Sequence, residues 1–187
     1  MVGLGNPGPE YAWSRHNAGW LVLDSIVAKI GLGEPRMKFG GAFWSAVSLE
    51  NGSVAFLKPF TYMNLSGTAV SESSRYYGIA PADVYVISDD AAIPFGKLRF
   101  RRAGSAGGHK GLASIIGALG TLDVPRLRIG VGAPPGTADM RGWVLGRFAK
   151  EQREAWPGVD DAAWTALVKW LRGESGPGFT LGITAPK

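Results

Sequence analysis

The 187-residue chain contains no cysteine and only two histidines. The lack of cysteine excludes disulfide bonds and thiolate metal sites, as is usual for proteins of the cytoplasm. No apolar run approaches the roughly 18 residues that a membrane span needs. The N-terminus also lacks the cationic start and apolar segment of a signal peptide. These absences predict a cytoplasmic protein that does not cross a membrane.

The composition is that of a folded, basic protein. Hydrophobic residues make up 45% of the chain, which excludes disorder as its main state. The length suits a single domain, residues 1–187, with a full core. The net charge of +5 and the pI near 9.6 indicate an anionic partner, although ordinary basic enzymes share such values.

The first 19 residues contain the strongest functional pattern. Met1–Leu4 is typical of the end of a buried strand, and the Gly/Pro-rich run Gly5–Pro9 cannot continue it. Loops that leave strand ends are where open α/β sheets place their ligands. Asn6, Tyr11 and His16 lie in or just after this loop, so they are candidate site residues. The alternative is that Asn6 only forms a turn and that His16 only neighbours a helix cap.

A second unusual loop spans residues 61–67, between a predicted strand at 53–58 and a predicted helix at 68–77. Ser66 is placed to cap this helix. Asn64 then lies at the ligand edge of the sheet, as a binding residue or as a further capping residue.

Asp89 and Asp90 follow a short apolar run, residues 84–88, which predicts a buried central strand. Such a carboxylate pair can bind metal, orient a histidine or cap a turn. Two histidines and no cysteine leave few ligands for a transition metal. A Mg²⁺ site built from carboxylates and water remains an alternative.

Basic residues alternate along two predicted strands, residues 96–102 and 126–132, which places those of each strand on one face. These residues are Lys97, Arg99, Arg101, Arg126 and Arg128. A solvated face would show the same pattern.

The glycine-rich run 103–108 precedes His109 and Lys110, which open a predicted helix that ends at Leu119. Such a turn at a helix N-terminus can hold a phosphate. The run GSAGGHKG nevertheless matches neither the Walker nor the dinucleotide-binding spacing.

The remaining segments complete the predicted order of elements. They are a helix at 20–30, a loop at 31–41, a strand at 42–49 joined by an Asn-Gly turn to the strand at 53–58, a loop at 133–141, a C-terminal helix at 160–172 and an irregular tail from residue 173.

Together these motifs resemble bacterial peptidyl-tRNA hydrolases. The matching runs are VGLGNPGPEYAWSRHNAGW, KPFTYMNLSG, the DD pair before IPFGKLRFR, GSAGGHKGL, RLRIGVG and WVLGRF. They extend from Val2 to about Phe148 in the expected order. The resemblance implies a monomeric cytoplasmic enzyme with one α/β domain, a mixed, twisted sheet flanked by helices, and no metal or cofactor. It also implies cleavage of the ester between a peptide and the 3′ ribose of tRNA.

The resemblance assigns roles to the catalytic candidates. His16 matches the general base that activates water, Asp89 matches the carboxylate that orients it, and Asn64 matches the residue that stabilises the oxyanion and binds substrate. His109 lies in a glycine-rich turn with no comparable carboxylate nearby in its motif. We therefore expect His16, and not His109, to be the base.

The resemblance also implies binding residues. Asn6 matches the position that requires a blocked, peptide-like amine, and Tyr11 and Tyr62 match positions that flank the 3′ end. The basic positions implicated in tRNA phosphate contacts are Arg99, Arg101 and Arg128. The alternatives are a noncatalytic RNA-binding module and a small-molecule esterase or amidase. The esterase would not need the basic face.

Three features depart from the family pattern. Lys110 stands where asparagine is usual, so we expect it to be a substrate contact of altered chemistry. Ala92 replaces an acidic residue that many members have. The first strand is also short, which predicts either a truncated start or a brief strand.

Overall fold

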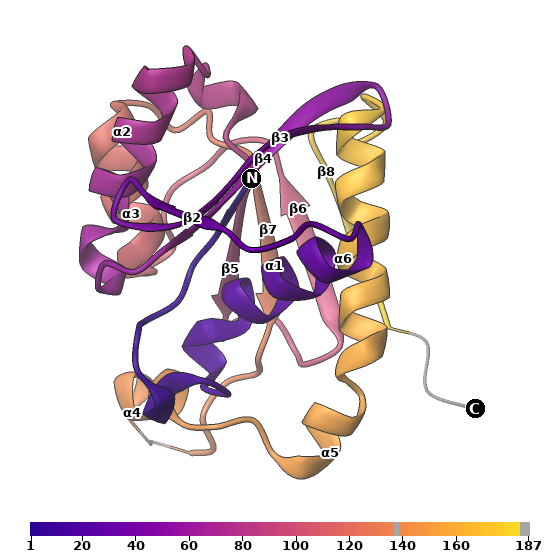
Figure 1. The fold of residues 1–187 in the computed structure, drawn as a ribbon. Coiled ribbons are helices and arrows are strands. Elements are labelled where there is room, and N and C mark those ends of the chain that lie inside the picture. Colours follow the sequence, from indigo (N-terminus) through magenta and orange to yellow (C-terminus); the bar gives the residue numbers. More distant parts are fainter. Residues whose placement is uncertain (137–138, 184–187) are drawn as a thin grey trace.

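The computed structural model describes residues 1–136 and 139–183. Its centre is one mixed sheet of eight strands in the order β2-β3-β4-β1-β5-β7-β6-β8. The inner strands β4, β1, β5 and β7 run parallel, and the pairs toward both edges are antiparallel. Helices lie on both sides of the sheet (Figure 1). The predicted α/β fold with a mixed sheet is confirmed.

The strands are β1 (Val2–Gly3), β2 (Arg36–Lys38), β3 (Gly41–Leu49), β4 (Gly52–Pro59), β5 (Val86–Asp90), β6 (Lys97–Arg101), β7 (Arg126–Gly130) and β8 (Gly178–Gly182). The α-helices are α1 (Ala18–Lys29), α2 (Ser66–Tyr77), α3 (Lys110–Leu119), α4 (Met140–Leu145), α5 (Lys150–Glu154) and α6 (Trp156–Leu171). Short 3₁₀ turns are η1 (Pro9–Tyr11), η2 (Arg15–Asn17), η3 (Met63–Leu65) and η4 (Pro81–Asp83).

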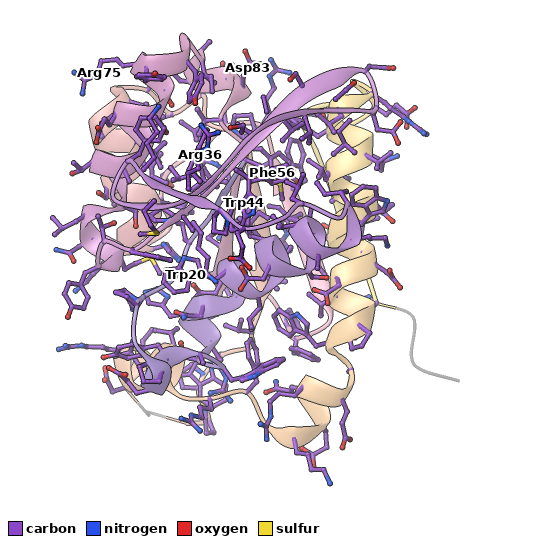
Figure 2. The ribbon with its side chains drawn as sticks, in the orientation of Figure 1. Trp20, Arg36, Trp44, Phe56, Arg75 and Asp83 are labelled. Carbon is purple, nitrogen blue, oxygen red and sulfur yellow. The ribbon has the colours of Figure 1, made fainter. Side chains whose placement is uncertain are left out.

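The sheet separates two apolar cores. Helices α1 and α6 cover one face, and helices α2 and α3 cover the other (Figure 1). On the α1/α6 side, Phe56 of β4 is fully buried. Its cross-strand neighbour Trp44 donates a hydrogen bond from Nε1 to the Gly33 carbonyl at 2.8 Å, which attaches the loop before β2 to the sheet (Figure 2).

Helix α1 begins in direct backbone contact with the sheet. A Cβ atom at Gly19 would collide with the carbonyl oxygen of Ile87 and with the backbone of Leu4, and a Cβ at Gly3 would collide with the Gly19 carbonyl. The Trp20 amide also donates to the Leu4 carbonyl at 3.1 Å. Glycine is required here because the two backbones approach closely. The contact lies two residues before Asp89 and three residues after His16.

Two predicted irregular segments contain strands. Residues 36–38 of the predicted loop form edge strand β2 on β3, and residues 178–182 of the predicted tail form edge strand β8 on β6. The prediction was wrong for both segments because each strand is short and half exposed, and neighbours far along the chain supply its pairing. The end of that tail, 184–187, and residues 137–138 of the predicted loop at 133–141 lie outside the described residues.

Helix ends also differ from the sequence pattern. Ser66 does not cap α2, because it is the first residue of that helix and its hydroxyl donates back to the Met63 carbonyl at 3.0 Å. Helix α1 begins two residues before Trp20, and α6 begins at Trp156, four residues before the predicted start. Within the described ranges, no helix has the length and hydropathy that crossing a lipid bilayer requires.

Candidate active site

A cavity of about 810 Å³ opens at the carboxyl ends of β1, β4 and β5. Its walls come from the loops after these strands, the glycine-rich loop before α3, and helix α4. The predicted site residues Asn6, Tyr11, His16, Tyr62, Asn64, Asp89, Lys110 and Arg128 all line it. Segments that are far apart in sequence therefore converge on one pocket, as expected for an open α/β sheet.

His16 and Asp89 form a hydrogen-bonded pair. His16 Nδ1 lies 2.8 Å from Asp89 Oδ1, and the two side chains are only 12% and 3% exposed. Turn η2 supplies the histidine, and the end of β5 supplies the carboxylate. Asp89 therefore lies near the end of β5, as the apolar run before it predicts, and within hydrogen-bond distance of His16.

His109 joins this pair, which corrects one expectation. Its Nε2 lies 2.9 Å from the same Asp89 Oδ1, so a carboxylate does lie beside it. The motif around His109 holds no acid, but β5 brings Asp89 from 20 positions away in the sequence. The rings of His16 and His109 lie 4.9 Å apart.

The hydrogen bonds assign different states to the two imidazoles. His109 Nδ1 caps α3, because it accepts from the backbone amides of Gly111 and Leu112 at 3.1 and 3.2 Å. Its proton must therefore be on Nε2, which donates to Asp89. His16 donates from Nδ1 to Asp89, and its Nε2 has no hydrogen-bond partner in the described part of the chain. Of the two rings, only His16 retains a nitrogen lone pair that can accept a proton.

The carboxylate between the rings is held in its charged form. Burial alone would raise the pKa of Asp89, but the favourable electrostatics and hydrogen bond of His109, followed by those of His16, outweigh it and hold the pKa well below its usual range. An ionised Asp89 favours the Nδ1–H tautomer of His16 and stabilises its imidazolium.

The same three side chains are the candidate ligand set for a metal ion. One ligand atom each from His16, Asp89 and His109 lies within 4.8 Å of the others. A metal ion would have to displace the protons that both rings donate to Asp89, because a ligating nitrogen needs its lone pair.

Asp90 has a separate, structural role. Its Oδ1 accepts from the Ala92 amide at 2.8 Å, and its Oδ2 forms an ion pair with Arg128. Of the roles considered for the carboxylate pair, the hydrogen bonds of Asp89 fit the orientation of a histidine, and those of Asp90 fit the capping of a turn.

Asn6 is fixed in the floor of the pocket. Its Oδ1 accepts from the Met63 amide at 2.9 Å. Asn17 holds the Asn6 backbone at both ends, because it accepts from the Asn6 amide at 2.8 Å and donates to the Asn6 carbonyl at 3.0 Å. Sequence reasoning assigned no role to Asn17, although a buried polar residue directly after His16 was a signal. The Asn6 Nδ2 group has no partner within the described ranges and can donate to a ligand.

The other predicted binding residues are more exposed. Asn64 lies in turn η3 and Lys110 begins α3, both with exposed side chains on the pocket rim. Tyr62 is 63% exposed, whereas Tyr11 is half-buried at the end of η1.

The arginines of β6 and β7 differ in how they are exposed and in what they contact. Arg99 and Arg128 are cross-strand neighbours, and Arg128 also reaches the pocket. Arg101 is exposed at the end of β6 and is not among the residues that line the pocket. Arg126 is buried, and its guanidinium donates to four backbone carbonyls, those of Gly104, Ser105, Leu122 and Val124. Arg126 therefore holds the glycine-rich loop to β7.

Helix α4 forms the wall that sequence reasoning missed. Met140, Val144 and Leu145 present apolar side chains to the pocket, and Asp139 caps the helix through the amides of Arg141 and Gly142. The sequence showed no helical periodicity here because α4 has only six residues.

Comparison with known proteins matches this site to one family. The family described as peptidyl-tRNA hydrolase matches residues 1–177 of the chain. The peptidyl-tRNA hydrolase of Symbiobacterium thermophilum is 48% identical over 172 residues, which cover 90% of this chain and 85% of that protein. The enzyme of Geobacillus kaustophilus is 47% identical over 166 residues, covering 89% and 87%.

Solved structures agree with the sequence comparisons. The crystal structure of peptidyl-tRNA hydrolase from Acinetobacter baumannii superposes with a TM-score of 0.85 at 35% identity, covering 92% of this chain and 88% of that one. The resemblance and the enzyme class predicted from the sequence are both confirmed. The chain belongs to the peptidyl-tRNA hydrolase family.

Proposed function

We propose that the chain hydrolyses the ester bond between a peptide and the 3′ ribose of tRNA, and so returns free tRNA to translation. The observation that carries this proposal is the state of His16. Its Nδ1 lies 2.8 Å from a buried carboxylate oxygen, and its Nε2 has no hydrogen-bond partner in the described ranges and belongs to a ring that lines a large pocket. A histidine in this arrangement can activate water near neutral pH.

In the proposed reaction, His16 Nε2 takes a proton from water as the water oxygen attacks the ester carbonyl carbon. Asp89 stabilises the resulting imidazolium through Nδ1. The tetrahedral intermediate then expels the ribose 3′ oxygen, which receives the proton from His16. The products are a peptide with a free carboxyl group and a tRNA with a free 3′ hydroxyl, so one water is consumed and the base is restored.

Asn64 and Asn6 are assigned to the two sides of the scissile ester. The Asn64 amide is a neutral donor on the rim and stabilises the oxyanion of the intermediate. The Asn6 Nδ2 group donates to a peptide-like carbonyl. Its Oδ1 already accepts a hydrogen bond from the Met63 amide, so it is a weaker acceptor for a charged amine. This arrangement favours a blocked, peptide-like amine over a free aminoacyl group.

The remaining roles concern the tRNA. Tyr11 and Tyr62 stack on or flank the single-stranded 3′ end, and Lys110 contacts it. The basic residues of β6 and β7, namely Arg99, Arg101 and Arg128, contact the phosphates. We further propose that the enzyme acts as a monomer in the cytoplasm and requires no cofactor.

The test uses three ligands with the purified protein: peptidyl-tRNA, free tRNA and small esters. We expect cleavage of peptidyl-tRNA, binding of free tRNA without cleavage, and little turnover of small esters. His16→Ala is the control, because it should bind tRNA and lose hydrolysis. Binding without cleavage by the unaltered protein would support an RNA-binding module instead. Equal turnover of small esters would support a general esterase.

A further inference from the structure

The residue directly before the proposed base is a buried arginine. Arg15 is 7% exposed and lies in turn η2 with His16. Its guanidinium carbon lies 3.6 Å from the centre of the Trp143 ring, and Nη1 donates to the Trp143 carbonyl at 3.3 Å. The Arg15 amide also donates to the Gly146 carbonyl at 3.0 Å. Arg15 therefore contacts the body and the C-terminal end of helix α4.

Trp143 has a second attachment beyond α4. Its indole Nε1 donates to the Gly132 carbonyl at 2.6 Å, just after β7. One face of the indole therefore contacts Arg15, while its Nε1 edge is bound to the segment that follows β7. Helix α4 has only six residues, and so short a helix depends on such attachments for its position.

No carboxylate of the described residues forms an ion pair with the Arg15 guanidinium. Its Nε also has no hydrogen-bond partner in the described part of the chain. The cation is held by the face of Trp143 and by a peptide carbonyl, and the centre of the Phe148 ring lies farther away, at 5.9 Å. A planar guanidinium can stack on an indole and donate sideways at once, which a lysine ammonium cannot do.

We propose that Arg15 is a positioning residue that clamps α4 to the turn carrying His16. The clamp is defined by Arg15, Trp143 and the Gly132 carbonyl. It fixes the distance between the apolar wall of the pocket and the base, so that the substrate ester is held against His16 Nε2. Because a misplacement of about 1 Å at a reacting centre can cost on the order of 100-fold in rate, the clamp contributes to turnover without touching substrate.

This inference rests on the proposed function for its kinetic readout, but hydrogen exchange tests it separately. In Arg15→Lys and in Trp143→Leu, we expect amides of residues 140–146 to exchange at least tenfold faster, while those of α1 and α6 are unchanged. We also expect kcat for peptidyl-tRNA to fall about tenfold in each variant, with the affinity for deacylated tRNA unchanged. The double variant should be no worse than Trp143→Leu alone, because Trp143→Leu already removes the ring on which Arg15 stacks.

Two further variants separate the clamp from a general loss of structure. Trp143→Phe keeps a ring for Arg15 to stack on and loses only the hydrogen bond to the Gly132 carbonyl, and should retain kcat within about threefold. Tyr76→Leu is the matched control, because it removes an exposed lysine–aromatic contact of the same 3.6 Å, made by Lys38, away from the pocket. It should leave both exchange and kcat unchanged.

The possible results are distinguishable. Unchanged exchange in α4, additive losses in the double variant, or equal losses of tRNA affinity would each overturn the clamp. If the chain did not cleave peptidyl-tRNA at all, the proposed function would fail, while the exchange of α4 would still report on the clamp.

Discussion

His109 donates its Nε2 proton to the same Asp89 oxygen that receives the Nδ1 proton of His16. One buried carboxylate oxygen thus accepts hydrogen bonds from two imidazoles, and the second nitrogen of each ring has different surroundings. Nδ1 of His109 caps α3, and Nε2 of His16, which lines the pocket, is the atom that we propose as the base. The two histidines should respond differently to substitution.

We expect His16→Ala to lower kcat by about 10²–10⁴, the usual contribution of a general base. His109→Asn should cost no more than roughly tenfold, because asparagine caps helices well and its amide can still donate to Asp89. Steady-state kinetics of both folded variants decides the assignment. A His16→Ala enzyme with near-normal kcat, or a His109→Asn enzyme as impaired as His16→Ala, would contradict it.

Arg101 should affect tRNA affinity more than chemistry. It is exposed at the end of β6 and lies outside the pocket lining. If it contacts a phosphate, Arg101→Ala should reduce the slope of log affinity against log salt by about one. Cleavage of a minimal peptidyl-adenosine fragment should change little.

The matched control is Arg172→Ala, since Arg172 follows α6 and pairs with Glu50. It removes the same charge from another part of the surface and should leave the slope as it is. Equal losses on tRNA and on the fragment in Arg101→Ala would show that this arginine serves the fold or the chemistry.

Lys110 offers a test of the departure from the family pattern. It is exposed at the first position of α3 and faces the pocket rim, where an anion is favoured. If Lys110 holds a phosphate of the terminal nucleotide, Lys110→Asn should weaken substrate binding at low salt and lessen its salt dependence. Affinity measured at two salt concentrations decides this. Unchanged affinity at both would leave Lys110 as a surface charge.

Asp160 should make stability depend on pH. Burial raises the pKa of this α6 carboxyl to about 6, against the hydrogen bonds of Ser25 and Trp156, which lower it. The folded state therefore binds the proton more tightly than the unfolded state. Stability should fall as pH rises from about 4 to about 6 and then stay reduced.

Asp160→Asn mimics the protonated form and should remove this penalty. After allowance for the solvent that reaches the carboxyl, we expect a gain of about 1 kcal/mol in unfolding free energy at pH 8 and none at pH 4. Denaturant unfolding at both pH values measures it. Asp161→Asn, at an exposed neighbour paired with Lys29, is the control. A gain that is equal at pH 4 and pH 8 would rule out titration of Asp160 as its cause.

The sequence predicted most of the site because its signals are local. A Gly/Pro loop before His16, Asn64 between a strand and a helix, and Asp89 at the end of an apolar run each identify a sheet edge. The contacts between His109 and Asp89 and between Arg15 and Trp143 join segments that are distant in the sequence. No local sequence pattern predicts such contacts. Strand β8 was missed for the same reason, because β6 supplies its pairing partner.

The glycine contact under α1 has a consequence for how this enzyme tolerates change. Between Gly19 and Ile87 the helix and the sheet meet through backbone atoms, and the space between them does not admit a Cβ atom. His16 and Asp89 each lie within three residues of that point. A single methyl group added at Gly19 would therefore push the turn that carries His16 away from the strand that carries Asp89, without altering either side chain.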